Sequence, residues 1–460
     1  MSTDLASLVA ELGADVVLTE PDRTYGYQRD RAFDPQAGLP LAVVRARSTE
    51  DVQAAVRFCA RHRVPVVPRG AGTGLSGGAS AVEGCVVIST ERMTAIDIDP
   101  YNRVATVQPG LLNAQVKEAA AEHGLWYPPD PSSYQICSIG GNVATNAGGL
   151  CCVKYGVTTD YVLGVSVVLA DGTFVKLGGP RLKDVAGLPL AKLFVGSEGT
   201  LGVITEVVLR LIQEQRVSAT LVASFESLAD ATAAVLDITT NHRPCMLELM
   251  DNATINAVED MVSMGLNRDA AAMVVIQSDE PAGHASAECA RMAGRCEQHH
   301  AAEVFATDDF EEGEAFVAAR RLAVPAIERL GAVLMEDVGV PLRQLGALID
   351  GVAKISAASE LTIAVVAHAG DGNTHPMIVF DPADEEMAQR ATASFGAVME
   401  LAMRLGGTIT GEHGVGRLKQ PWLGDYLGPE ALALNLRVKR ALDPDGILNP
   451  GSLFAAQPRD

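Results

Sequence analysis

The stretch VVPRGAGTGLSGGA, residues 66–79, contains five glycines and no acidic residue, and it begins with an apolar pair. Within it, residues 72–77 (GTGLSG) match the dinucleotide fingerprint G-x-G-x-x-G, and Asp97 lies about 20 residues further on, where that fingerprint has its ribose-binding acid. A Rossmann fold also requires a long helix directly after the glycines. Here residues 79–84 lead straight into the apolar run 85–89, which leaves no room for that helix. The context therefore argues against a Rossmann fold and makes Asp97 an accidental match.

Two further clusters of glycine and small polar residues follow the first one. SIGGNVATNAGG occupies residues 138–149, shortly after YPPDPSS at 127–133, and VGSEGTLGVIT occupies residues 195–205. Glycine loops present backbone N–H groups and let an anion approach closely, so they can hold a pyrophosphate without a helix. One such loop alone could equally be a structural turn. Three of them favour an extended polar ligand, such as a dinucleotide, wrapped by backbone donors.

Length and composition limit the class of protein. The chain has 460 residues, of which 48% are hydrophobic and 20% charged, so we expect a globular protein of two or three domains. Acidic residues exceed basic ones by 57 − 36 = 21, which argues against nucleic acid as a partner. No apolar run reaches the roughly 18 residues of a membrane span, and the acidic N-terminal segment is unlike a signal peptide. We therefore expect a cytoplasmic protein without a membrane span, whose eight cysteines are buried, reduced thiols.

The spacing of apolar residues predicts a different secondary-structure content in the two halves of the chain. Short β-branched runs in the first half predict strands at 64–68, 85–89, 95–100, 104–108, 162–169 and 203–212. Two helices are predicted in the same half, at 49–62 and 112–123, the first one opened by Ser48. From about residue 216, amphipathic patterns predict helices at 224–240, 252–264, 285–298, 310–330, 342–360 and 385–405, with strands at 271–277 and 362–367. We expect an α+β protein with a domain boundary near residues 210–217.

A second constellation, HAGDGNTHP at residues 368–376, lies between two apolar runs. If Asp371 and Gly372 form the two-residue tip of a hairpin, His368 faces His375 directly across the strands. Their Cβ atoms would then lie about 5 Å apart on one face, close enough to share a divalent ion. The alternative is a hairpin whose histidines merely pack.

The stretch GEHGVG, residues 411–416, places a carboxylate beside an imidazole after the strand-like residues 408–410. Adjacent residues of an extended strand point to opposite faces, so Glu412 could bind a metal while His413 reaches a substrate. Two histidines and one glutamate leave coordination positions open, as a catalytic metal site requires.

The three glycine clusters, in this order and together with KYG at residues 154–156, resemble the FAD-binding domain of the vanillyl-alcohol oxidase family. The resemblance implies a PCMH-type FAD-binding domain of two subdomains, in which the first loop holds the pyrophosphate and the others line the adenosine and the isoalloxazine. Some members attach the flavin through a histidine in the first loop; this chain has none there, which implies non-covalent FAD. The implied FAD-binding residues are Arg69, Gly70, Ala71, Gly72, Thr73, Gly74, Leu75, Gly77, Asp130, Pro131, Ser132, Ser138, Gly140, Gly141, Asn142, Thr145, Gly148, Gly149, Tyr155, Glu198, Gly202, Ile204 and Asn449.

With the histidine motifs included, the chain from about Arg45 to Phe454 is similar to the D-2-hydroxyacid dehydrogenase branch of that family, which includes D-lactate dehydrogenase, the glycolate oxidase catalytic subunit and D-2-hydroxyglutarate dehydrogenase. The resemblance implies that His368, His375 and Glu412 hold zinc or manganese, that His413 is the general base, and that Arg320 binds the substrate carboxylate, with Arg321 aligning less well. The implied reaction moves a hydride from the substrate Cα to flavin N5 and yields a 2-oxo acid.

Two positions bear on the substrate. The D-2-hydroxyglutarate enzymes use a lysine and an asparagine where this chain has Met335 and Met377, which favours a smaller acid such as D-lactate or glycolate, although Lys419 is an alternative basic anchor. Other classes stay open: a D-2-hydroxyglutarate dehydrogenase, an oxygen-using oxidase, a non-redox flavin transferase like the alkyl-dihydroxyacetone-phosphate synthases, a flavin-free metal hydrolase, or a non-catalytic flavoprotein subunit.

The expected organisation has three parts: an FAD-binding domain at 1–215, an α+β cap domain with a central antiparallel sheet and the metal site at 216–410, and a C-terminal segment at 411–460 that returns to the FAD domain. The expected partners are a small 2-hydroxy acid and an electron acceptor, which could be a quinone, an electron-transfer flavoprotein, a cytochrome or an iron–sulfur subunit. A homodimer is a further possibility.

Overall fold

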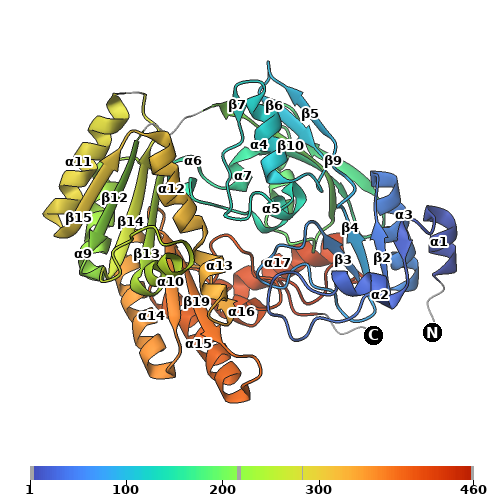
Figure 1. Cartoon of the computed structure of the whole chain (residues 1–460). Coiled ribbons are helices and arrows are strands. Elements are labelled where there is room, and N and C mark those ends of the chain that lie inside the picture. The colour runs from blue at the N-terminus through green and yellow to red at the C-terminus, as the bar shows by residue number, and fades with distance from the viewer. Residues whose placement is uncertain (1–4, 215–218, 282, 457–460) are drawn as a thin grey trace. The chain divides into compact units, whose positions relative to one another are not determined.

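The computed structural model describes residues 5–214, 219–281 and 283–456, which form two compact units (Figure 1). Unit 1 consists of Met1–Ala147, Val157–Glu214 and Glu412–Asp460, and unit 2 consists of Gly148–Gly156 and Gln215–Gly411. The predicted boundary at residues 215–216 lies outside the described residues. Residues 148–156, which the prediction placed with the FAD-binding domain, cluster with unit 2.

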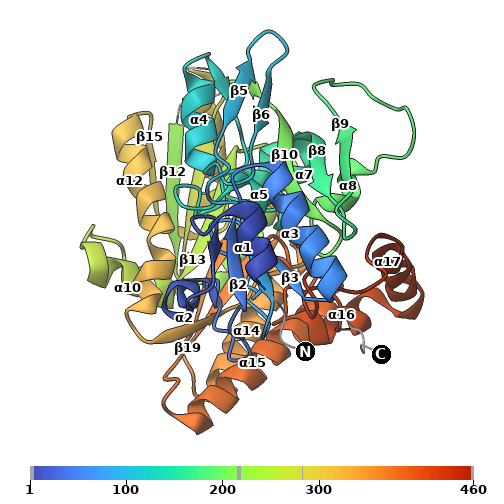
Figure 2. The ribbon, with the colours of Figure 1, turned by 90° about the vertical axis from the view of Figure 1, so that its right-hand side faces the viewer.

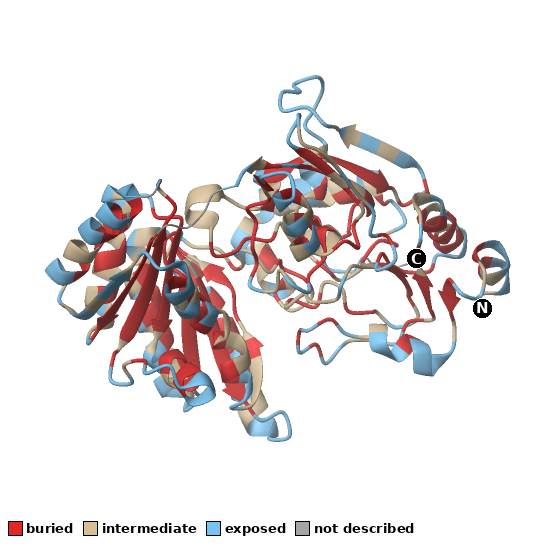
Figure 3. Cartoon of the chain, turned by 45° about the horizontal axis from the view of Figure 1, so that its top comes forward, coloured by how far each residue is buried: buried red, intermediate tan, exposed pale blue. Residues whose placement is uncertain are grey.

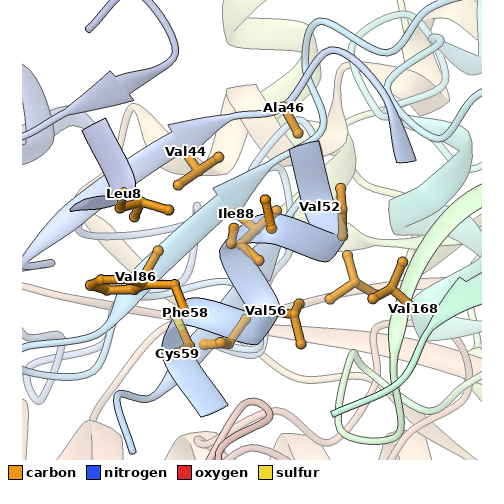
Figure 4. Close-up of a cluster of buried hydrophobic side chains, with 14 of the residues drawn as sticks. Leu8, Val44, Ala46, Val52, Val56, Phe58, Cys59, Val86, Ile88 and Val168 are labelled. Atoms are coloured by element: carbon orange, nitrogen blue, oxygen red, sulfur yellow. The ribbon is translucent and has the colours of Figure 1, made fainter. Parts of the chain in front are cut away.

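The first sheet of unit 1 has the strand order β1-β2-β4-β3, with β2 and β3 both parallel to β4. Its strands are β1 (Val17–Leu18), β2 (Ala42–Arg45), β3 (Val66–Arg69) and β4 (Val86–Ser89). Helix α3 (Thr49–His62) starts as predicted, because the Ser48 side chain accepts a hydrogen bond from the N–H of Asp51. Its apolar side chains, together with Leu8 of α1 (Ala6–Leu12), pack with Val44 and Ile88 into a buried core (Figure 4).

No helix lies between β3 and β4, where all residues are described. The chain passes from the glycine loop directly into β4, as the sequence predicted. This arrangement confirms the argument against a Rossmann fold, because there is no helix N-terminus after the glycines to receive a pyrophosphate.

The second sheet of unit 1 is antiparallel, in the order β5-β6-β10-β8-β9. Its strands are β5 (Ile96–Asp99), β6 (Val104–Val107), β8 (Val162–Val168), β9 (Phe174–Gly178) and β10 (Val203–Arg210). The loop from β9 to α8 (Ala191–Phe194) extends away from this sheet in Figure 2. The remaining elements of unit 1 are α2 (Pro21–Thr24), η1 (Tyr25–Tyr27), α4 (Asn113–Ala121), β7 (Leu125–Trp126), α5 (Ile139–Thr145), α7 (Thr158–Tyr161), β11 (Ile212–Gln213), α16 (Gln420–Leu427) and α17 (Pro429–Leu442). After α17 the chain returns to the first sheet, where Leu448 forms a bridge with Val66.

Unit 2 is built on an antiparallel sheet in the order β15-β12-β14-β13-β18-β19-β16, with β17 also paired to β19. Its strands are β12 (Ala219–Phe225), β13 (Met246–Asp251), β14 (Ala272–Ser278), β15 (Ala301–Thr307), β16 (Ala332–Met335), β17 (Val338–Gly339), β18 (Ile363–His368) and β19 (Asn373–Phe380). Its helices are α6 (Cys152–Tyr155), α9 (Leu228–Asn241), α10 (Asn252–Val262), α11 (His284–Gln298), α12 (Phe310–Arg321), α13 (Ala323–Glu328), η2 (Leu342–Gln344), α14 (Leu345–Ser359) and α15 (Glu385–Arg404). Most strands are buried while the helices keep an exposed face (Figure 3). The predicted α+β class with a central antiparallel sheet is confirmed.

Several predicted element limits were wrong. The predicted helix 224–240 starts only at Leu228, because residues 219–225 form β12. The predicted helix 310–330 is two helices, and Pro325 lies in the first turn of the second one, where a missing N–H is tolerated. The glycine cluster 138–149 was predicted as a loop, but most of it forms α5.

The remaining expectations from composition concern membranes and thiols. In the described ranges, no helix is long and apolar enough to cross a membrane. No disulfide joins the eight cysteines; six are buried, whereas Cys151 and Cys152 are partly exposed. The cytoplasmic location stays a prediction.

Candidate active site

The glycine loop after β3 in unit 1 is closely packed against Arg69. The partly buried guanidinium of Arg69 donates to the carbonyl oxygen of Ala79 across the loop at 3.1 Å and lies over the ring of Tyr27. Gly72 has a φ of 71°, and a Cβ there would lie 2.2 Å from Nη2 of Arg69. Burial lowers the pKa of Arg69. A side chain at position 72 would therefore be strained by the positive φ and would displace the guanidinium, so the backbone conformation at this position favours glycine.

Ser138 joins the first and second predicted FAD segments. Its hydroxyl accepts from the N–H of Gly141 at 3.4 Å, which caps α5, and from the N–H of Ala71 at 3.1 Å. A Cβ at Gly70 would lie 2.2 Å from this hydroxyl oxygen. The sequence signal for α5 was therefore Ser138, a helix cap that directly precedes the glycine-rich residues. The two glycine-rich segments therefore meet at one serine hydroxyl, and their predicted contact with a phosphate-containing cofactor stays a prediction.

The third predicted FAD segment, residues 195–205, is hydrogen-bonded to the C-terminal part of unit 1. The Glu198 carboxylate accepts from the N–H groups of Val415 and Gly416, both at 2.7 Å, and from the Ser452 hydroxyl at 3.2 Å. Burial raises the pKa of Glu198, against the opposing effect of these backbone donors. The Asn449 amide donates to the carbonyl oxygens of Gly78 and Glu198. These side chains connect protein segments, and their predicted contact with FAD stays a prediction.

Other predicted FAD residues lie in varied surroundings. Asn142 is buried and contacts Asn113 and Cys137, and the Thr145 hydroxyl donates to the carbonyl of Gly141 within α5. Asp130 is also buried. Gly202 directly precedes β10, and Ile204 is the second residue of this strand.

Three predicted FAD residues, Gly148, Gly149 and Tyr155, belong to unit 2. There the Tyr155 hydroxyl donates to Asp279, whose carboxylate also pairs with Lys154. A role of Tyr155 toward FAD stays a prediction.

The two histidines of unit 2 lie on one face of the sheet, but in a different register from the predicted one. His368 pairs with Asn373 and His375 with Val366, so the connection between β18 and β19 has four residues instead of two. The N–H groups of Asp371 and Gly372 both donate to the carbonyl of His368, which produces this wider turn. The histidines are therefore diagonal neighbours, and their ring centroids lie 5.1 Å apart. A ring nitrogen of one lies within 4.8 Å of a ring nitrogen of the other, close enough to share an ion.

Glu248 on β13 connects His368 with Arg320, and sequence reasoning missed it. Its Oε1 lies 2.8 Å from Nδ1 of His368, and its Oε2 lies 2.8 Å from Nη2 of Arg320 on α12. All three residues are buried. The available signal was a single acidic residue inside the apolar run 245–250. Nε of Arg320 is buried and has no hydrogen-bond partner among the described residues, so this atom can bind a ligand.

Asp337, also missed, lies on the other side of His375. The fully buried carboxylate accepts from the Thr410 hydroxyl at 2.6 Å and from the Gly411 N–H at 2.9 Å, and its second oxygen lies 3.8 Å from Nδ1 of His375. It thereby holds the end of unit 2, and the next peptide bond leads to Glu412.

Glu412 and His413 open the last segment of unit 1. Residues 411–413 form a bend, so the prediction that the two side chains point to opposite faces of a strand was wrong. Nε2 of His413 lies 3.8 Å from Oε1 of Glu412, and the His413 carbonyl accepts from the hydroxyl of Ser76 at 3.1 Å. Ser76 belongs to the glycine loop, which therefore holds the histidine segment.

Met335 and Met377 are cross-strand partners on β16 and β19 and pack in the core of unit 2. Met377 lies two residues from His375 on the same face. The substrate-facing role inferred for the two thioethers stays a prediction.

Comparisons with known proteins identify the family and the fold of the chain. Residues 40–178 match the FAD binding domain family, and residues 214–453 match the C-terminal domain of FAD linked oxidases. Among the relatives is the glycolate oxidase subunit GlcD of Bacillus subtilis, 40% identical over 92% of this chain and 90% of the relative. Another is the D-lactate dehydrogenase of Archaeoglobus fulgidus, 32% identical over 97% of this chain and 99% of the relative. The structure of p-cresol methylhydroxylase, 17% identical, superposes with a TM-score of 0.82 over 99% of this chain and 97% of its own, which confirms the PCMH-type fold.

Proposed function

Because the chain belongs to the family of FAD linked oxidases and is an FAD-dependent oxidoreductase, we propose that it oxidises a small D-2-hydroxy acid, such as D-lactate or glycolate, to the 2-oxo acid. Two kinds of relative support this substrate class, since their names specify glycolate and D-lactate. The observation that carries the proposal is the buried group of His368, Glu248 and Arg320 on one face of the sheet of unit 2. It combines a metal-ligand side chain with a cation suited to a carboxylate.

The proposal includes a divalent ion, zinc or manganese, held by His368, His375 and Glu412. The donor set fits, because two imidazoles lie on one face at ligand spacing and Asp337 holds Gly411, the residue bonded to Glu412. When bound, such an ion would lower the pKa of the substrate hydroxyl, and FAD would accept the hydride from Cα.

The protein's own side chains bind the acid and move its proton. The Nε–H of Arg320 would donate to the substrate carboxylate, while Nη2 stays with Glu248. His413 would accept the hydroxyl proton at a ring nitrogen. Its carbonyl is tied by Ser76 to the glycine loop, so the base and the proposed pyrophosphate loop belong to one hydrogen-bonded segment of unit 1.

The test is anaerobic reduction of the bound flavin by a panel of D- and L-2-hydroxy acids that includes D-lactate, glycolate and D-2-hydroxyglutarate. We expect bleaching by the small D-acids, strong slowing by a chelator, and loss of reduction in His413→Ala and His368→Ala. His123→Ala, an exposed histidine of unit 1, is the control and should bleach normally. If no 2-hydroxy acid bleaches the flavin, the proposed function is wrong.

The same measurement separates the alternatives. Fast reduction by D-2-hydroxyglutarate alone would show that Met335 and Met377 do not exclude a dicarboxylate. Reoxidation by oxygen at the turnover rate would identify an oxidase. One relative's name specifies a subunit and another, 32% identical over 98% of this chain, is a D-lactate dehydrogenase [cytochrome] of Arabidopsis thaliana. We therefore propose a partner subunit or a cytochrome as electron acceptor, to be tested by reoxidation of the reduced flavin.

A further inference from the structure

We propose that Glu248 is a positioning residue that orients the His368 imidazole and the Arg320 guanidinium at the same time. The inference rests on the proposed function for what the two side chains bind. The geometry of the three side chains is independent of the proposed function, because all three residues belong to unit 2.

The strand register places Glu248 opposite His368. β13 and β18 pair Leu249 with Ala367 and Met250 with Val366, so the next step of this antiparallel ladder brings the glutamate to the histidine. Their side chains lie on one face of the sheet, and the carboxylate oxygens approach Nδ1 of His368 at 2.8 and 3.0 Å.

Arg320 approaches the same carboxylate from α12. Its Nη2 lies 2.8 Å from Oε2 of Glu248, and the relative exposures are 0% for Glu248, 2% for Arg320 and 3% for His368. A buried carboxylate is costly unless a cation and hydrogen bonds compensate it, and here both come from the candidate site. An apolar residue at position 248 would pack in the surrounding core at lower cost. The presence of a glutamate there therefore points to a role in the candidate site.

One carboxylate thus determines two orientations. By accepting from Nδ1–H of His368 it selects the tautomer with a lone pair on Nε2, which is the atom then available to a metal ion. By accepting from Nη2 of Arg320 it fixes the plane of the guanidinium, so that Nε remains for the substrate carboxylate. A glutamine keeps only one acceptor oxygen, and its NH₂ group would face one of the two donors.

The first experiment measures Mn²⁺ binding to the FAD-loaded full chain by equilibrium dialysis. We expect Glu248→Gln to weaken Mn²⁺ binding by about 10- to 100-fold, the usual effect of losing such a partner of a metal-bound histidine. We also expect a raised KM for the acid through Arg320, and partial recovery of both in Glu248→Asp. Glu259→Gln is the matched control: this glutamate of unit 2 accepts three backbone N–H groups after α10, from Met264, Gly265 and Leu266, none of which belongs to the candidate site. It should bind Mn²⁺ like the wild type.

The second experiment needs neither metal nor turnover. In ¹⁵N-histidine-labelled wild-type protein without metal, the His368 resonances, assigned with His368→Gln, should show a proton on Nδ1 and none on Nε2. A proton on Nε2 of neutral His368 would overturn the inference even if Glu248→Gln does not fold.

The outcomes separate the two proposals. If wild type and His368→Ala bind Mn²⁺ equally, the metal part of the proposed function is wrong, while the Nδ1 tautomer would still support the role of Glu248. If His368→Ala loses Mn²⁺ but Glu248→Gln retains it together with the wild-type KM, the positioning role is wrong and the proposed function stands.

Discussion

Gly416 allows the segment after His413 to lie against the glycine loop, and replacing it by alanine should displace the proposed catalytic base. Gly416 has a φ of 53°, and a Cβ there would lie 2.0 Å from the backbone oxygen of Ser76. An ordinary contact begins at 3.4 Å, so the two segments would have to separate by about 3.4 − 2.0 = 1.4 Å. Neither side of this contact is a flexible side chain, so the backbone itself must move.

The cost follows from the bonds that this movement would break. The Gly416 N–H donates to Glu198 at 2.7 Å, and the next two N–H groups donate to the Ser76 oxygen at 3.0 and 3.1 Å. At about 1 kcal/mol for each net hydrogen bond, with roughly 1 kcal/mol more for a non-glycine residue at positive φ, Gly416→Ala should cost on the order of 4 kcal/mol. A displacement of about 1 Å at a catalytic group slows chemistry by roughly 10²-fold. We therefore expect flavin reduction to slow by at least that factor.

The assay is anaerobic stopped-flow reduction of the flavin at saturating acid, alongside thermal unfolding. Gly428→Ala is the control, since Gly428 belongs to the same C-terminal part of unit 1, has a φ of 75° and has open space where a Cβ would lie. It should lose about 1–3 kcal/mol of stability, because its ψ of 164° lies in a region that residues other than glycine rarely adopt, and it should keep the wild-type rate. Wild-type flavin reduction in Gly416→Ala would refute the reasoning that this contact positions His413.

Three further predictions concern the cofactor, pH and the metal. Gly72→Ala should displace Arg69 and raise the FAD dissociation constant about tenfold, equivalent to 1.4 kcal/mol. Gly84→Ala, at a similar φ of 69° but in open space, should leave that constant unchanged. Flavin fluorescence titration measures both dissociation constants, and equal values for the two variants would contradict the packing argument. Burial raises the pKa of Asp251, the cap of α10, from 3.8 to about 6, so the folded state holds this proton more tightly and wild-type stability falls as pH rises from about 4 to 6. Asp251→Asn should therefore be more stable than wild type at pH 7, by at most about 3 kcal/mol, and equal to it below pH 4; a lower urea midpoint at pH 7 would show the opposite sign. Dialysis against a chelator should slow acid-dependent flavin reduction strongly and leave the FAD absorbance, and Mn²⁺ should restore the rate. Full activity in the chelated protein would exclude a metal role.

The sequence predicted local features well where a few neighbouring residues determine the conformation. Ser48 starts α3 at the predicted residue, because a cap acts within one turn. The hairpin of His368 and His375 was also predicted, but with the wrong register, since Asp371-Gly372 suggested a two-residue turn and the chain forms a four-residue connection. The two histidines still lie on one face of the sheet, because a register shift of two residues preserves the alternation of side chains.

Contacts between distant residues could not be predicted in the same way. Glu248 and His368 are 120 residues apart and meet only because β13 pairs with β18. Asp337 reaches Gly411 across 74 residues. No local pattern marks either acid as a partner of a site residue, apart from its unusual place next to apolar neighbours.

By itself, the sequence determined that this is a globular protein with glycine-rich loops for an extended cofactor, no Rossmann helix, and a histidine hairpin capable of holding an ion. These properties depend on the conformational freedom of glycine and on the alternation of strands, which act over a few residues. Only the tertiary structure decided which carboxylates orient the site, since Glu198, Glu248 and Asp337 each find their partners through long-range packing. Burial makes those partners necessary: a carboxylate removed from water must find donors, and the fold alone decides which donors are near.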